Sequence, residues 1–305
     1  MRTTNKTTAV CVSIAALTIT FAGCSRDTPD STLSALPPSV TVSQLVDVTA
    51  PTKAPILISA NNFRDLAGPD IGYITSDGRR VREGVVYRSN ALTTNDSDAA
   101  ALDSLGIKTV FDLRTPAEVT EKPDRVPAGA RYQNIDVSGG TKTATVLSSV
   151  DLSTPEGARN MVTGAYRKIV TDPAMRAQFG ALLTDVAVTD GPLIIHCSAG
   201  KDRAGWASAV LLKIAGVDDA TVMSNYLLTN EYSKDSIESV VAKTTASDGE
   251  QAGAAVRVIY GVSPEFLQAG FDEISTIFGT FENYLTMGLG LTPDSIAALK
   301  TKLTS

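Results

Sequence analysis

Short apolar runs alternate with longer segments whose apolar residues recur every three or four positions, from about residue 56 to the end of the chain. The runs at 109–113, 132–137 and 192–196 predict strands, and residues 73–86 predict a hairpin that turns at Ser76-Asp77-Gly78. The run at 192–196 lacks the alternation of polar and apolar residues expected of a half-exposed strand. It is typical of a strand buried on both faces of a parallel sheet.

Helical spacing fills the segments between and after these strands. It predicts helices at 96–105 (capped by Asp96 or Ser97), 155–170, 174–188 and 203–215 (closed by Gly216), a helical turn from Pro116, and a helix that Asp218 caps. From 231 onward the pattern is helical throughout. Because strands alternate with helices, the sequence predicts an α/β fold with a central, mostly parallel sheet flanked by helices.

The first 55 residues show neither pattern. A basic start with Arg2 and Lys6 precedes a mostly apolar run at 9–21, which is too short to span a bilayer comfortably and predicts an export signal. Phe21-Ala22-Gly23-Cys24 then resembles a bacterial lipobox, which predicts a lipoprotein signal over residues 1–24 and a lipid on Cys24. Phe21 stands where such motifs usually carry Leu, so a plain secretory signal or an uncleaved anchor is the alternative.

Residues 25–55 are rich in Ser, Thr, Pro, Val and Asp and predict a flexible linker. This leaves 56–305 as one domain with a full core. We therefore expect an exported protein in the cell envelope, held by lipid on the outer face of the plasma membrane, with secretion as the alternative. Residues 138–154 are rich in Ser, Thr and Gly and predict a mobile loop near the site.

Composition narrows the possible functions. The net charge of −6 argues against nucleic acid as a partner. The single histidine, His196, argues against a histidine-based metal site or a Ser-His-Asp triad, so we expect no metal and no cofactor. Of three cysteines, Cys11 and Cys24 lie in the predicted signal, so Cys197 is the one thiol of the domain and has no disulfide partner there. A lone cysteine in an exported domain favours a chemical role.

Cys197 lies between the predicted strand at 192–196 and the predicted helix at 203–215. Such a loop directs backbone N–H groups and the positive end of a helix dipole at one point, where an oxyanion fits. Arg203, six positions after the cysteine, adds a charge-assisted, two-pronged grip. The same field favours the thiolate, so the sequence predicts nucleophilic attack on phosphorus, with phosphate bound by the loop residues Ser198, Ala199, Gly200 and Lys201.

His196-Cys197-x5-Arg203 is the signature of the cysteine-dependent protein tyrosine phosphatase superfamily, and the fuller string His196 to Gly205 resembles its atypical bacterial members of the mycobacterial secreted type B group. Three other segments support the resemblance: Asn62-Phe63-Arg64-Asp65-Leu66, Gly84 to Ser89, and Leu105 to Arg114. It implies a tyrosine phosphatase-like catalytic domain over 56–305, with a helical cover over the active site in the C-terminal region. It implies a phosphocysteine on Cys197 and a phosphorylated protein or phosphoinositide as substrate.

Two carboxylates are candidates for the acid that protonates the leaving oxygen. Asp202 lies in the loop itself, and Asp136 follows a predicted strand; we favour Asp202. His196 precedes the nucleophile and is expected to fix the loop and tune the thiolate. Arg64, Asp65, Asp112 and Arg114 are expected to give structural support, with Asp112 and Arg114 supporting the loop by ion pairs.

Ala204 is a departure, because the superfamily usually has Ser or Thr after the arginine. The missing hydroxyl predicts slower hydrolysis of a phosphocysteine. The first hypothesis is therefore a phosphatase that acts on phosphotyrosine, with phosphoserine, phosphothreonine or phosphoinositides as wider substrates. The second is a non-catalytic or very slow phospho-ligand binding lipoprotein. A sulfur-transfer or arsenate-reducing enzyme is a third; arsenate reduction needs resolving thiols, and the domain at 56–305 has none besides Cys197.

Overall fold

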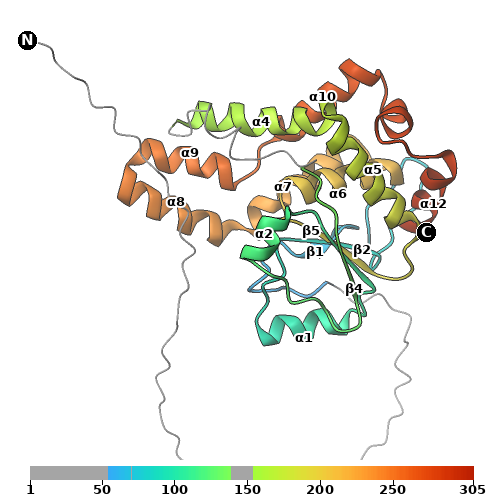
Figure 1. Ribbon diagram of the computed structural model, residues 1–305, viewed down its shortest axis with the longest axis horizontal. Coiled ribbons are helices and arrows are strands. Elements are labelled where there is room, and N and C mark those ends of the chain that lie inside the picture. The colour runs from blue at the N-terminus through green and yellow to red at the C-terminus, as the bar shows by residue number, and fades with distance from the viewer. Residues whose placement is uncertain (1–53, 70, 139–153) are drawn as a thin grey trace, which may run out of the picture. The chain divides into compact units, whose positions relative to one another are not determined.

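A five-stranded sheet with the order β1-β2-β5-β3-β4 forms the centre of the computed structural model (Figure 1). The structure describes residues 54–69, 71–138 and 154–305, all within one compact unit, Thr49–Ser305. The strands are β1 (Arg64–Asp65), β2 (Val86–Ser89), β3 (Thr109–Asp112), β4 (Arg131–Asn134) and β5 (Leu193–His196). β1 pairs antiparallel with β2, and the other three pairings are parallel, which confirms the predicted mostly parallel α/β fold.

Neighbouring residues of the central strands enter different cores. In β5, Leu193 and Ile195 belong to the larger buried cluster, whereas Ile194 belongs to the smaller one. In β3, Phe111 and Val110 divide in the same way. Because both faces of these strands are buried, their residues are apolar without alternation, as the pattern at 192–196 predicted.

Helices contribute to both cores. α1 (Asp96–Ser104) adds Leu102 to the smaller cluster. The larger cluster takes residues from α4 (Pro155–Thr171), α5 (Pro173–Val188), α6 (Arg203–Ala215), α7 (Asp219–Tyr232), α10 (Pro264–Phe278) and α12 (Pro293–Leu303). The remaining helical elements are α2 (Pro116–Glu121), α8 (Lys234–Asp248), α9 (Glu250–Tyr260), α11 (Phe281–Asn283) and the π-helical turn η1 (Tyr284–Gly288).

The C-terminal helices pack against one another and against α4. α8 packs against α9, and both α9 and α10 pack against α4, so this part of the chain is helical as predicted. That these helices cover the active site stays a prediction. Most of the predicted mobile loop, 139–153, lies outside the described residues.

The predicted hairpin at 73–86 is present over 73–81, where the Thr75 and Val81 N–H groups donate to the Arg79 and Tyr73 carbonyls at 2.9 and 2.8 Å, and it does not extend to 86. One antiparallel bridge joins Ile74 to Arg80 across the Ser76-Asp77-Gly78 turn. Beyond it, the Arg80 and Arg82 N–H groups donate to Ser305 and Leu303 carbonyls at the C-terminus, at 3.4 and 2.7 Å. Past Val81 the segment bonds to the C-terminal residues and no longer to the first arm of the hairpin, and Val86–Ser89 forms a central strand beside β5.

Helix ends follow the predicted capping residues with one exception. Asp218 caps α7, and Gly216 closes α6 in the left-handed conformation, with φ of 89°. α1 is capped by Asn95, not by Asp96 or Ser97, because the Asn95 side chain accepts the Asp98 N–H at 2.8 Å. Asn is as good an N-cap as Asp or Ser, so the sequence alone could not choose among three adjacent candidates.

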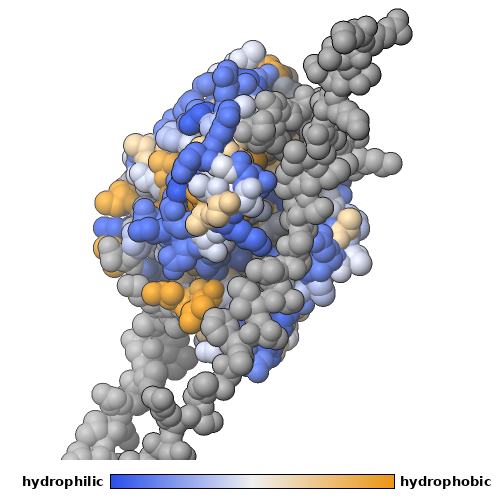
Figure 2. Space-filling view, turned by 90° about the vertical axis from the view of Figure 1, so that its left-hand side faces the viewer, coloured by the Kyte–Doolittle hydropathy of each residue, from blue (hydrophilic) through white to orange (hydrophobic). Residues whose placement is uncertain are grey.

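Hydrophilic residues cover most of the described surface on the face shown in Figure 2, and hydrophobic residues form small separate patches there. Among the described residues, no helix combines the length and hydropathy that crossing a membrane requires. The predicted signal and the linker at 25–55 lie outside the described residues except for 54 and 55.

Candidate active site

Cys197 and Arg203 lie at the two ends of one loop. β5 ends at His196, Cys197 follows directly, and Arg203 is the first residue of α6. β2 and β3 flank β5 in parallel and also end at this edge of the sheet. The predicted strand–loop–helix arrangement is therefore present, with the N-terminus of a 13-residue helix beside the thiol.

Gly200 gives the loop its tight path. Its φ of 71° lies in the region that favours glycine. A Cβ here would come within 2.4 Å of the Ser89 carbonyl oxygen. Any other residue would therefore push the loop away from the end of β2.

The loop carbonyls are held by groups of the surrounding protein. The donors are the Ala91 N–H, the Asn62 amide and the Arg88 guanidinium, which donate to the carbonyls of Ser198, Ala199 and Gly200 at 3.2, 2.9 and 2.7 Å. Within the described residues, the N–H groups of 198–202 have no hydrogen bond to protein. The loop therefore offers unpaired N–H donors next to the thiol, as an oxyanion site requires.

Glu118 binds the Arg203 guanidinium and was missed by the sequence analysis. The Nη1 and Nη2 groups of Arg203 donate to the two Glu118 carboxylate oxygens, each at 2.7 Å. Ser198 Oγ donates to Glu118 Oε1 at 2.5 Å and accepts from Arg203 at 3.1 Å. The bidentate pair fixes one edge of the guanidinium, so Glu118 positions Arg203 at the mouth of the loop.

Glu118 is ionised at any physiological pH. Its burial opposes ionisation, but the hydrogen bonds and charge of Arg203 outweigh burial and lower the pKa of Glu118 to about 2. Stability from the pair is therefore present above the ordinary glutamate pKa and is lost as the pH falls toward 2. The one sequence signal was the capping box of Thr115 and Glu118, which marks the start of α2 but not a contact 85 residues away.

Asp202 and Lys201 form an ion pair. Lys201 Nζ donates to the Asp202 carboxylate at 2.8 and 2.7 Å, and Lys201 is buried. Tyr166 in α4 donates to the same carboxylate at 3.2 Å and lies 2.8 Å from the Tyr226 hydroxyl. Asp202 therefore lies in the loop as predicted, and Lys201, predicted to bind phosphate, is joined to it.

Asp136 has local partners only. Its carboxylate accepts the Ser138 N–H at 2.9 Å and the Ser138 hydroxyl at 2.5 Å. In the described part of the chain, Asp136 forms no hydrogen bond or ion pair with residues 197–203. Asp202 is therefore the better placed of the two acid candidates.

A buried ion cluster lies next to the nucleophile. Arg114 donates to Asp112 at 2.7 Å and to Asp124 at 2.5 Å, and all three side chains are buried. His196 is the last residue of β5 and directly precedes Cys197, and its Nε2 atom lies 3.3 Å from the Asp124 carboxylate. Asp112, Asp124 and His196 could geometrically surround a cation. Because the Arg114 guanidinium already takes both carboxylates, we assign the cluster to support of the loop, as predicted for Asp112 and Arg114.

Ala204 is fully buried in the first turn of α6. Its methyl group offers no hydrogen bond to the thiol. The departure seen in the sequence is therefore buried next to Arg203 in the chain and is not a surface difference.

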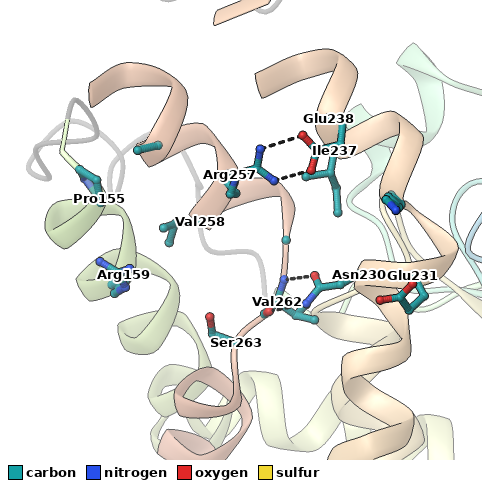
Figure 3. A pocket seen from close by; sticks show the side chains of 13 residues that line it. Pro155, Arg159, Asn230, Glu231, Ile237, Glu238, Arg257, Val258, Val262 and Ser263 are labelled. Carbon is teal, nitrogen blue, oxygen red and sulfur yellow. Dashed lines mark hydrogen bonds and ion pairs between the residues drawn. The ribbon is translucent and has the colours of Figure 1, made fainter. Parts of the chain in front are cut away.

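A cavity of about 580 Å³ lies elsewhere, between α4, α7, α8 and α9 (Figure 3). None of the predicted site residues lines it. Arg257 on its wall is paired with Glu238 at 2.6 and 2.8 Å, and Asn230 is bonded to the Val262 backbone. These two polar residues of its wall are therefore bonded to protein.

Comparisons with known proteins agree with this site. Residues 56–305 match the model of a tyrosine phosphatase family. A protein of Cupriavidus necator named as a tyrosine-protein phosphatase is 28% identical over 229 residues, which cover 74% of this chain and 80% of the relative. The triple specificity protein phosphatase PtpB of Mycobacterium tuberculosis is 27% identical over 267 residues, with 75% of this chain and 91% of that protein covered.

A tyrosine-protein phosphatase of Nostoc commune is 31% identical over 219 residues, which cover 68% of this chain and 70% of that protein. The family match spans the sheet, the Cys197 loop and the C-terminal helices. Together with the parallel sheet and the loop between β5 and α6, these matches show that the chain belongs to the tyrosine phosphatase family.

Proposed function

We propose that this phosphatase hydrolyses phosphomonoesters through a phosphocysteine on Cys197. The thiolate sulfur attacks phosphorus, the S–P bond forms, and the bond from phosphorus to the substrate oxygen breaks. That oxygen takes a proton from a general acid, and water then cleaves the S–P bond to release phosphate. The observation that carries the proposal is the loop between Cys197 and Arg203, with its unpaired N–H donors.

Phosphate would be bound by the N–H groups of Ser198 to Asp202 and by Arg203. Glu118 holds Nη1 and Nη2 of the guanidinium, and within the described residues Nε has no protein partner. The arginine is therefore oriented before a substrate arrives, which lets its interaction strengthen in the transition state without reorganisation.

Asp202 is the proposed general acid. Its side chain is 37% exposed at the loop, whereas Asp136 is engaged with Ser138. Lys201 and Tyr166 fix the carboxyl group and hold it within the loop. The proton it loses to the leaving oxygen is recovered from the water that cleaves the phosphocysteine.

Asp202→Asn is expected to slow alkyl phosphates by about 10²-fold and to leave activated aryl phosphates nearly unchanged, because a good leaving oxygen needs little protonation. Rates against the leaving-group pKa measure this, and the basic-side fall of the pH–rate profile should vanish. Asp136→Asn is the matched control. The assignment is wrong if Asp136→Asn gives this pattern and Asp202→Asn does not.

Phosphotyrosine in proteins is the proposed main substrate, since the relatives are named tyrosine phosphatases. The triple specificity named for PtpB motivates phosphoserine, phosphothreonine and phosphoinositides as wider candidates. A panel of phosphopeptides, phosphoinositides and aryl phosphates, compared by kcat/KM on the purified full chain, ranks these classes. Turnover of phosphoinositides alone would contradict the proposal.

Ala204 favours one second function, a slow or non-catalytic phospho-ligand binding protein, because the buried methyl replaces a hydroxyl next to the thiol. The two functions differ in one observable. A trapped phosphocysteine that persists after a single turnover supports the binding protein, whereas steady release of phosphate excludes it.

We further propose export and lipid attachment at Cys24, from the basic start, the apolar run and the lipobox-like Phe21-Ala22-Gly23-Cys24. Cell fractionation should find the protein with membranes, and Cys24→Ala should release it or leave it unprocessed. A wild-type protein found in the cytosol with Met1 intact would contradict the proposal. Cys197→Ala is the control, since it removes a thiol and should leave the location unchanged.

A further inference from the structure

Two buried arginines lie behind the Cys197 loop. Arg64 in β1 and Arg88 in β2 are directly opposite each other in the antiparallel pair, and they are 3% and 1% exposed. Asn225 in α7 joins them: its carbonyl accepts from Arg64 at 3.2 Å, and its side-chain oxygen accepts from Arg88 at 3.4 Å. Both arginines thus belong to one buried cluster between the sheet and α7.

Neither arginine has a carboxylate partner. Within the described part of the chain, Arg64 donates to oxygens of Asn62, Asn225 and Thr229, all neutral, and Arg88 donates to Gly200 and Asn225. The Nε groups of both are buried without a hydrogen-bond partner. Arg114, buried to the same extent, has two carboxylates. Because an uncompensated buried charge is costly, negative charge at the neighbouring loop would stabilise this pair of arginines.

Arg88 reaches the catalytic loop. Its Nη2 donates to the Gly200 carbonyl at 2.7 Å. A Cβ at Gly205, in the first turn of α6, would lie 3.2 Å from the same Nη2, so the glycine leaves the space that the guanidinium uses. The guanidinium therefore lies between the loop and the turn of α6 that carries Ala204.

The other cations of the loop are already paired. Lys201 is bound by Asp202, and Arg203 is bound by Glu118. Tyr166 in α4 and Tyr226 in α7 face the loop, and their hydroxyl groups are hydrogen-bonded to each other. The His196 side chain faces Asp124. Arg88 is thus the loop-contacting cation whose charge has no carboxylate partner within the described residues.

Arg88 keeps its charge at neutral pH. Burial lowers the pKa of Arg88 to about 10 and is the largest effect on it. The nearby Tyr166 and Cys197 raise the pKa of Arg88. Burial and the neighbouring Arg88 also lower the pKa of Arg64. The attraction of a negative charge at the loop would offset the repulsion between the two arginines.

We propose that Arg88 is a positioning residue whose buried, carboxylate-free guanidinium stabilises the Cys197 thiolate and the bound phosphate from beneath the loop. It holds the Gly200 carbonyl inward and supplies positive charge where Ala204 supplies no hydroxyl. Arg64 keeps Asn62 and Asn225 in place behind it. This inference rests on the proposed thiolate mechanism and adds the source of the charge that favours the thiolate.

The test is the pH midpoint for alkylation of Cys197 by iodoacetamide in the full chain, read from the mass of the Cys197 peptide. Arg88→Gln keeps a donor for the Gly200 carbonyl and removes the charge, so the midpoint should rise by about one to two pH units. Arg88→Lys keeps the charge and should show less than half of that shift. The acid limb of kcat/KM against pH should move with the midpoint. Arg79→Gln, in an exposed turn, is the matched control and should leave the midpoint unchanged.

Two results would overturn the inference: an unchanged midpoint in Arg88→Gln, or equal shifts in Arg88→Gln and Arg88→Lys, which would show a purely structural role. If Arg88→Gln does not fold, Gly205→Ala replaces it, because the added Cβ displaces the guanidinium and retains its charge. A smaller upward shift is then expected, and no shift overturns the inference. Failure of the proposed mechanism would be seen separately, as turnover retained by Cys197→Ser.

Discussion

Cys197→Ser is expected to abolish hydrolysis of an aryl phosphate, with a loss of at least about 10⁴-fold in kcat. A serine hydroxyl is not ionised near neutral pH, so the nucleophile is lost although the side chain differs by one atom. Cys197 is buried at the end of β5, and the described domain has no second cysteine that could replace it. Release of the aryl alcohol under steady-state conditions measures the effect.

The fold of this variant provides the control. Cys197→Ser should keep the unfolding temperature of the wild type within a few degrees, and it should still bind inorganic phosphate, because the loop N–H groups and Arg203 are untouched. Turnover retained without added metal would rule out the thiolate mechanism. Loss of both turnover and phosphate binding would contradict the expectation that the loop keeps its structure without the thiol. The lost turnover would then be explained by the loop and not by the missing nucleophile.

The part of the site that sequence could predict is local. Cys197, Asp202 and Arg203 lie within seven residues of one another, between a strand and a helix whose patterns are strong. Because the loop between these two elements is short, the ends of the strand and the helix largely determine where its side chains lie. The left-handed cap at Gly216 also follows from a glycine placed directly after a helical pattern.

The part that sequence could not predict depends on contacts between distant segments. Glu118 reaches Arg203 across 85 residues, and Arg88 reaches Gly200 across 112. Neither spacing carries a periodic signal, and a lone Glu or Arg in a sequence has no visible partner. The same reason explains why the hairpin ends before residue 86, because Arg82 bonds to Leu303 at the opposite end of the chain.

Charge pairing was the least predictable feature. Lys201 was expected to bind phosphate, and the structure joins it to Asp202, its neighbour in the chain. Arg64 was expected to give structural support, and its hydrogen-bond partners among the described residues are all neutral. A sequence supplies the number of charges but not which of them are buried together, and burial decides whether a charge needs a partner.

Arg203→Lys is expected to lower kcat/KM by about 10²–10³-fold, because an ammonium cannot reproduce the planar fork that binds carboxylate and phosphate at once. In the structure, one edge of the Arg203 guanidinium is bonded to Glu118 through two nitrogens at 2.7 Å. A lysine would pair its single nitrogen with the Glu118 carboxylate and leave nothing directed at the phosphate. The measurement is kcat/KM for an aryl phosphate and a phosphotyrosine peptide, together with the affinity for inorganic phosphate.

Glu118→Gln separates positioning from charge. It keeps one oxygen for Arg203 and removes the ion pair, so we expect a smaller loss than in Arg203→Lys, about tenfold, with the unfolding temperature lowered. Because the pKa of Glu118 is held at about 2 by Arg203, the ratio of wild-type to variant rates should stay constant across the neutral pH range. The double variant Arg203→Lys with Glu118→Gln decides between two roles of the carboxylate. If Glu118 acts only through Arg203, the double variant is no slower than Arg203→Lys; a further tenfold loss would show that Glu118 acts on the substrate independently.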